Sequence, residues 1–126
     1  MSTSRIALRE DQTSFRPGET VQGTASWSFA DGIPEVVELR LFWFTRGQGV
    51  QDVSVVETLP FDRPRARESR PFHLRLPYAP YSFKGEFVSL TWALELVADS
   101  QEAVARVEIV LSPSGAEIEL SPRTHE

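Results

Sequence analysis

Side chains alternate between apolar and polar along much of this chain, and that alternation constrains the fold more than any other feature. From Val21 to Phe29 the odd-numbered positions are Val, Gly, Ala, Trp and Phe, whereas the even-numbered positions are Gln, Thr, Ser and Ser. A helix would spread these residues around its axis, but a strand places them on opposite faces of a sheet. The segment therefore predicts a half-buried strand.

The same period of two residues recurs along the sequence. It is long at residues 36–45 and 85–97, where Gly85 begins the second run. Shorter runs contain Ile6 and Leu8; Val53, Val55 and Leu59; Phe72, Leu74 and Leu76; Val107, Ile109 and Leu111; and Ile118 and Leu120. Turn-forming Pro, Gly, Asp and Ser residues separate the runs. Seven or eight short strands at this spacing predict an all-β fold, an immunoglobulin-like sandwich of two antiparallel sheets.

Length and composition fit one domain. A chain of 126 residues is close to the usual domain size. Trp27, Trp43 and Trp92 each fall on the apolar side of a predicted strand, where large rings are buried. We expect residues 1–120 to form a single sandwich and residues 121–126 to fray as a C-terminal tail.

Two stretches resemble arrestin-fold domains. Residues 15–23, Phe-Arg-Pro-Gly-Glu-Thr-Val-Gln-Gly, are similar to an early segment of that family, which reads aromatic, x, Pro-Gly-Glu, x, apolar, x, Gly. Residues 72–96 are similar to a later segment, in which an apolar strand ends in Pro, a Pro-Ser-x-x-Gly loop follows, and a long alternating strand begins. Here the loop reads Pro80-Tyr81-Ser82-Phe83-Lys84-Gly85. The resemblance covers most of the chain and implies a sandwich of arrestin type.

The arrestin-like family includes arrestins, retromer cargo-sorting subunits and bacterial sporulation-control relatives, which act mainly as adaptors or scaffolds. The resemblance therefore implies a non-catalytic, protein-binding adaptor or scaffold. Arrestins join two such sandwiches, whereas this chain has one and corresponds to half an arrestin. Functions that depend on a groove between two sandwiches are not carried over, and neither is any phosphate-sensing residue.

A basic run suggests one binding site. Arg63, Arg65, Arg67 and Arg70 fall within eight residues. Guanidinium groups bind carboxylates and phosphates in a forked geometry, so an acidic or phosphorylated peptide is a candidate ligand. The alternative is a solvated loop that nearby carboxylates partly neutralise.

Three aromatic residues suggest a second site. If Leu39 and Leu41 face the core, then Phe42 and Phe44 face outward, and Phe87 does so by the same parity on the later strand. Outward apolar groups on neighbouring strands predict an interface for a protein partner or for a second copy of the chain. The alternative is that a loop or the C-terminal tail covers them. An uncovered edge strand that accepts a peptide is a third candidate, although the sequence does not identify the edge.

Features of enzymes and metal sites are sparse. The chain has no Cys, two separated histidines (His73 and His125), no paired metal-ligand spacing and no Gly-x-Ser-x-Gly motif. We expect neither an enzyme nor a cofactor or metal. Two alternatives stay open. One is a carbohydrate- or small-ligand-binding module that uses Tyr78, Tyr81 and Phe83. The other is a small hydrolase with two distant carboxylates.

Charge and hydropathy limit the kinds of partner. A net charge of −5 opposes binding to nucleic acid and to anionic lipid. The first residues lack the apolar core of a signal peptide, and no apolar run approaches the ~20 residues of a membrane span. We therefore expect a cytoplasmic protein with a protein partner, no integral membrane association and no nucleic acid.

Overall fold

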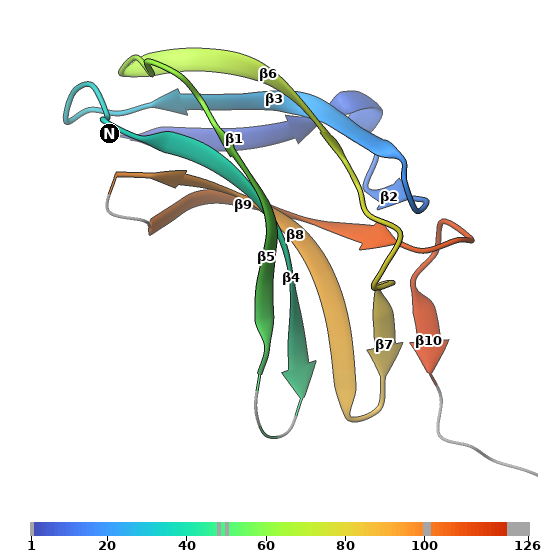
Figure 1. The fold of residues 1–126 in the computed structure, drawn as a ribbon. Coiled ribbons are helices and arrows are strands. Elements are labelled where there is room, and N and C mark those ends of the chain that lie inside the picture. The colour runs from blue at the N-terminus through green and yellow to red at the C-terminus, as the bar shows by residue number, and fades with distance from the viewer. Residues whose placement is uncertain (1, 48, 50, 100–101, 121–126) are drawn as a thin grey trace, which may run out of the picture.

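The computed structural model describes residues 2–47, 49, 51–99 and 102–120, which form ten strands and one 3-10 turn (Figure 1). The elements are β1 (Thr3–Leu8), η1 (Arg9–Asp11), β2 (Ser14–Phe15), β3 (Thr20–Ser28), β4 (Val37–Gly47), β5 (Val53–Pro60), β6 (Arg67–Arg75), β7 (Phe83–Gly85), β8 (Val88–Ala98), β9 (Glu102–Leu111) and β10 (Ile118–Leu120). A small sheet has the order β1-β3-β6. A large sheet has the order β10-β7-β8-β4-β5, with β9 on β8 and β2 on β9.

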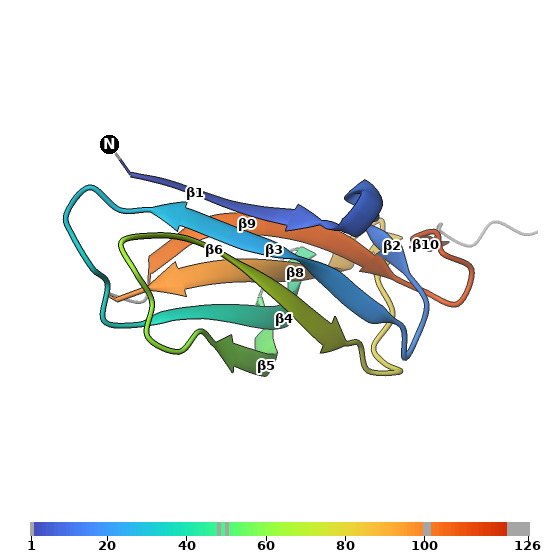
Figure 2. The same cartoon turned by 90° about the horizontal axis from the view of Figure 1, so that it is seen from above.

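The two sheets face each other and enclose one main core, which confirms the predicted all-β sandwich (Figures 1 and 2). Trp27 of the small sheet and Trp92 of the large sheet are buried in it, while Trp43 is half-buried against it. The predicted alternation of β3 is correct, because Val21 and Ala25 are completely buried on the same face as Trp27.

The N-terminal segment belongs to both sheets. Strand β1 pairs antiparallel with β3, whereas β2 pairs parallel with β9 of the opposite sheet. The chain changes sheet through η1, where Glu10 and Asp11 have φ values of 56° and 55°. The first strands therefore close one side of the sandwich, and Figure 2 shows β1 over β9 on that side.

The early motif forms a tight turn and a close approach between strands. Glu19 donates its backbone N–H to the carbonyl of Arg16 at 3.0 Å, and Gly18 between them has a φ of +78°. This backbone suits Pro17 followed by Gly in a β-turn. A β carbon at Gly23 would lie 2.4 Å from the carbonyl oxygen of Ala7, so glycine is needed where β3 passes β1.

The later predicted strand is wrong at its start. Gly85 does not begin the long strand but ends β7. The chain then turns through Glu86 and Phe87 into β8, which pairs antiparallel with β7. A β carbon at Gly85 would lie 2.7 Å from the carbonyl oxygen of Val88, so the turn is too tight for a side chain there.

The predicted parity of β5 is also wrong. Leu41 is opposite Glu57, but the next residue, Phe42, is opposite Val55. Val56 is therefore the extra residue of a β-bulge, and a bulge shifts the alternation by one position. Val53 and Val55 consequently face the side opposite to Leu59, where the sequence placed all three together.

A buried serine joins the loop before β7 to the end of β9. Ser82 donates its backbone N–H to the carbonyl of Leu111 at 2.7 Å, and its Oγ accepts the Leu111 N–H at 2.9 Å. Both residues are buried. Ser82 of the Pro80-Tyr81-Ser82-Phe83-Lys84-Gly85 segment therefore has a structural role.

The large sheet extends beyond the small one. In Figure 1 the ends of β4, β5, β8 and β7 curve away from β1, β3 and β6. Exposed apolar residues, including Val53, Phe87 and Val88, lie at or near these ends. This part of the sheet is open to contact with another molecule.

Candidate functional site

The basic run spans the loop that crosses between the sheets, from β5 to β6, and the first residues of β6: Arg63 and Arg65 lie in the loop, and Arg67 and Arg70 lie in β6. The loop is anchored on the core, because the Phe61 ring packs on Trp27 with centroids 5.6 Å apart. The Trp27 indole N–H donates to the carbonyl of Arg65 at 2.7 Å. Phe29 donates its backbone N–H to the carbonyl of Ala66 at 2.8 Å. The loop therefore has a fixed position relative to β3.

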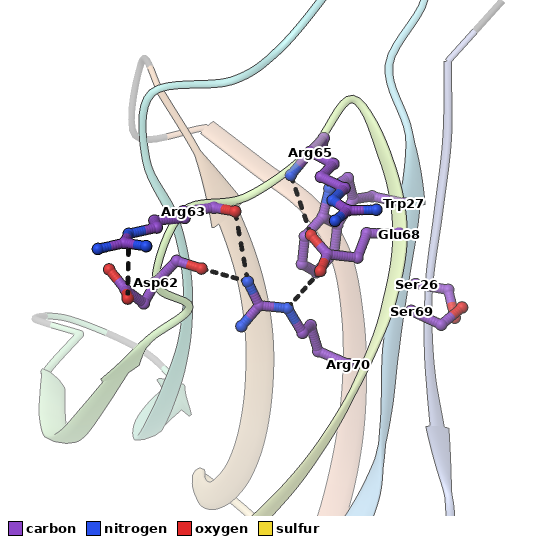
Figure 3. A network of polar contacts seen from close by, with 8 residues as sticks. All are labelled: Ser26, Trp27, Asp62, Arg63, Arg65, Glu68, Ser69 and Arg70. Carbon is purple, nitrogen blue, oxygen red and sulfur yellow. Dashed lines mark hydrogen bonds and ion pairs between the residues drawn. The ribbon is translucent and has the colours of Figure 1, made fainter.

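Arg70 and Glu68 of β6 form hydrogen bonds with the backbone of the loop (Figure 3). The Nε of Arg70 donates to Glu68 Oε2 at 2.6 Å. Its Nη2 donates to the carbonyls of Asp62 and Arg63. Glu68 Oε1 accepts the backbone N–H of Arg65 at 2.9 Å. One guanidinium and one carboxylate thus bind the loop backbone at three residues, Asp62, Arg63 and Arg65.

The pKa of Glu68 lies below its ordinary value. The main cause is the side-chain hydrogen bond from Arg70, followed by the backbone hydrogen bond from Arg65. Both stabilise the ionised carboxylate. Glu68 is therefore negative at neutral pH and compensates the charge of Arg70.

The four arginines have different environments. Arg70 is three-quarters buried, with 25% of its side chain exposed, and organises the loop. Arg63, Arg65 and Arg67 are exposed. Arg63 lies 3.9 Å from Asp62, but both side chains are more than 90% exposed and such a pair is weak. Arg63, Arg65 and Arg67 are thus accessible to an anionic partner, and their predicted role remains a prediction.

The outer face of the small sheet continues this basic surface. Arg5 of β1 is opposite Ser26, Ser26 is opposite Ser69, and Arg67 is opposite Ser28. The Ser26 and Ser69 hydroxyls are 2.9 Å apart, and a shallow depression lies over them. Strands β1, β3 and β6 contain one carboxylate, Glu68, which Arg70 already pairs. Exposed arginines and hydroxyls therefore dominate this face.

Phe42 and Phe44 lie on the outer face of the large sheet, on the side opposite to Leu39 and Leu41. They form a small separate cluster with Ala93 and are only 6% and 7% exposed. The Arg106 guanidinium covers both rings, at 5.3 and 4.7 Å from the ring centroids. Arg46 lies 4.9 Å from the Phe44 centroid. The predicted outward direction is correct, but arginines cover the rings, a form of cover that the sequence did not indicate.

Phe87 has a different environment. It lies in the turn between β7 and β8, outside the long strand, and is 67% exposed. The turn is close to the end of β4, because a β carbon at Gly47 would lie 2.2 Å from the Phe87 carbonyl oxygen. Of the three predicted interface residues, Phe87 alone presents a large apolar surface.

The aromatic loop of the ligand-binding alternative is partly structural. Phe83 packs against the main core. Tyr78 is exposed, and its hydroxyl accepts a hydrogen bond from Arg75 Nη2 at 2.9 Å. Tyr81 is also exposed. A role for Tyr78 and Tyr81 in ligand binding remains a prediction.

The described residues contain neither a metal-binding cluster nor a membrane-spanning helix. No group of three or more His, Asp or Glu residues in this part of the chain is arranged to hold a metal. None of its helices has the length and apolar character needed to cross a membrane. His73 is exposed on β6, as predicted, and His125 lies outside the described residues, as does the predicted frayed tail at 121–126.

Two features were missed by the sequence reasoning. Arg106 covers Phe42 and Phe44, although it is more than sixty residues away in the sequence. Val53, Val55 and Val56 are exposed on β5, the last strand of the large sheet. The sequence does contain an indication of the exposed β5 edge, because residues 48–61 have no Lys or Arg of the kind that protects a strand edge.

Comparison with known proteins supports the fold. No family model matches this sequence, and no curated protein matches it. Among solved structures, Spo0M, a sporulation control protein from Bacillus subtilis, is similar with a TM-score of 0.57 and 18% sequence identity. The match covers 88% of this chain and 49% of Spo0M, so this chain spans about half the length of that protein. A second similar structure is the alkylpurine DNA glycosylase AlkC of Pseudomonas fluorescens bound to DNA, with a TM-score of 0.44, 8% identity, and coverage of 88% of this chain and 30% of that one. The likeness to Spo0M supports an arrestin-like fold.

Proposed function

We propose that this chain is a non-catalytic adaptor or scaffold domain that binds an acidic segment of another protein. The observation that carries the proposal is the segregation of charge. The chain has a net charge of −5, yet Arg5, Arg63, Arg65 and Arg67 are exposed on the small sheet and its adjoining loop. Placing like charges together is unfavourable without an opposing surface, so the arrangement favours an anionic partner.

The loop geometry supports the same proposal. Contacts with Trp27, Glu68 and Arg70 fix its backbone, so Arg65 and Arg67 are presented from a rigid base. A preorganised site loses less conformational entropy on binding. The depression over Ser26 and Ser69 is shallow, and a shallow surface suits an extended peptide better than an enclosed small molecule.

Charge reversal of the loop tests the proposal. We expect a fluorescent acidic peptide, in phosphorylated and unphosphorylated forms, to bind the wild type and to lose at least about tenfold in affinity with Arg65→Glu and Arg67→Glu together. The control is Arg16→Glu with Lys84→Glu, which changes the net charge equally at exposed sites elsewhere. Equal affinity in the two double variants would mean that the loop is not the binding site.

A further inference from the structure

The uncovered edge of the large sheet has the features of a peptide-docking strand. Strand β5 pairs with β4 on one side, and no described strand pairs with it on the other. Figure 2 shows it on the side of the sandwich opposite to β1. Val53, Val55 and Val56 are 65%, 52% and 44% exposed. A free backbone edge with exposed apolar side chains is the surface to which extended peptides add as a strand.

The register shows which backbone groups are free. Thr45 donates its N–H to the Asp52 carbonyl, and Phe61 donates to the Val37 carbonyl. Hydrogen-bonded pairs alternate along an antiparallel ladder. With the bulge at Val56 included, the N–H and C=O groups of Val53, Val55 and Thr58 point away from β4. The free row ends at Thr58, because the next outward residue, Pro60, has no N–H.

The other long edges are obstructed. Strand β1 lies against β9 of the opposite sheet. On β6, Leu76 donates its N–H to the Glu19 carbonyl at one end of the β3–β6 ladder, and Ala66 accepts the Phe29 N–H at the other end. Hydrogen-bonded positions alternate between these two pairs, so the backbone of Pro71 points away from β3. Proline has no N–H to offer there, and it interrupts any added strand. Strand β10 has three residues. Among the described edges, β5 therefore offers the longest accessible row.

The apolar side chains of β5 continue the outer aromatic cluster. Val53 is directly opposite Phe44, and Val55 is directly opposite Phe42. Side chains of an added strand at alternate positions would lie beside the two valines. The partner segment should therefore have apolar residues two positions apart.

Charge distinguishes a foreign segment from a second copy. Residues 48–61 contain Asp52 and Glu57 but no Lys or Arg. Two β5 strands paired with each other would bring carboxylates together without a cation to compensate them, which is destabilising. A segment with a Lys or Arg beside Glu57 would instead form an ion pair.

We propose that β5 accepts an extended, basic and apolar segment of another protein as an added strand, with apolar side chains beside Val53 and Val55 and a cation beside Glu57. The inference rests on the proposed protein-binding function and assigns a second surface to it. The basic loop and the β5 edge differ in charge, so they would bind different segments.

A short fluorescent peptide of alternating Val and Lys tests the inference by anisotropy. We expect the wild type to bind this peptide. It should not bind a control peptide of alternating Val and Glu, and it should not bind a second control, the Val and Lys peptide with methylated backbone nitrogens. In hydrogen exchange, the peptide should slow the Val53, Val55 and Thr58 amides. Equal binding of the methylated peptide, no binding of the Val and Lys peptide, or unchanged exchange of these amides would overturn the inference.

Two variants with a matched control complete the test. Val55→Pro removes an outward N–H without removing a bond to β4 and should weaken binding about tenfold, whereas His73→Pro at an outward position of β6 should have no effect. Glu57→Lys should reverse the preference toward the Val and Glu peptide, and it keeps the inference testable if Val55→Pro does not fold. The inference would be overturned if Val55→Pro folds and binds the Val and Lys peptide with wild-type affinity, or if Glu57→Lys still prefers that peptide. It would also be overturned if the wild type is a dimer that Val55→Pro dissociates. The Val55→Pro variant should still bind the acidic peptide that tests the basic loop. A loss of binding at the β5 edge alone is thereby distinguished from a failure of the proposed function.

Discussion

Ser82 provides a single-atom test of how the large sheet is held together. Its Oγ accepts the N–H of Leu111 at 2.9 Å, and its own N–H donates to the Leu111 carbonyl at 2.7 Å. The change Ser82→Ala removes the first hydrogen bond and keeps the second. It leaves the Leu111 N–H without its acceptor in a part of the structure that is shielded from water.

The expected loss follows from that unpaired donor. A buried N–H without a partner costs about 1–3 kcal/mol, and the change in volume is small, so we expect the free energy of unfolding to fall by about 2 kcal/mol. Unfolding entropy is about 2.1 cal/mol/K per residue, so over a chain of 126 residues the melting temperature should fall by roughly 7 °C.

Urea unfolding followed by tryptophan fluorescence measures the free energy, and circular dichroism measures the melting temperature. Ser26→Ala is the matched control, because its Oγ forms an exposed hydrogen bond with Ser69. We expect that variant to stay within about 0.5 kcal/mol of the wild type. If Ser82→Ala loses no more than Ser26→Ala, the Leu111 amide has another acceptor and the reasoning is refuted.

Three further predictions follow from the packing and the charges. Gly23→Ala should lower the free energy of unfolding by about 1–3 kcal/mol, because the new β carbon would overlap the Ala7 carbonyl, and unchanged urea unfolding would contradict this. The pKa of Glu68 is lower in the folded protein than its ordinary value of 4.5. Ionised Glu68 therefore stabilises the folded state above pH 4.5, and this contribution is lost as pH falls through the folded pKa. The difference in stability from Glu68→Gln should therefore shrink as pH falls below the ordinary value, and a difference that does not vary with pH would contradict the assignment. Phe44→Ser should lower the free energy of unfolding by about 3 kcal/mol, whereas Phe87→Ser should lower it by less than about 0.5 kcal/mol. Phe87→Ser can therefore test self-association by sedimentation without unfolding the protein. A wild type that stays monomeric at high concentration would exclude self-association through Phe87.

Local periodicity predicted the strands well where a strand is regular. The alternation from Val21 to Phe29 depends only on which side chains face the core, and the sequence states this directly. It failed at Val56 and at Glu86, because a bulge and a hairpin turn depend on how a partner strand is aligned. Adjacent apolar residues occur at both points, Val55-Val56 and Phe87-Val88, but periodicity alone does not distinguish a bulge or a turn from an apolar residue that faces outward.

The candidate site was less predictable for a similar reason. The sequence grouped Arg63, Arg65, Arg67 and Arg70, but it did not distinguish Arg70, whose partners include loop carbonyls that approach it only after folding. The outer position of Phe42 followed from parity, yet its cover comes from β9, much later in the chain. Side-chain direction is encoded locally, whereas accessibility depends on distant residues.

The double membership of the first fifteen residues has a consequence for the newborn chain. Strand β1 finds its partner β3 soon after leaving the ribosome, but Ser14 and Phe15 pair with Val110 and Leu111. At typical translation rates of about 5–20 residues per second, those partners emerge roughly 5–20 seconds later. The second layer therefore cannot close over the first until Val110 and Leu111 have been synthesised, and the apolar side of the paired strands β1 and β3 must stay shielded from other nascent chains during that interval.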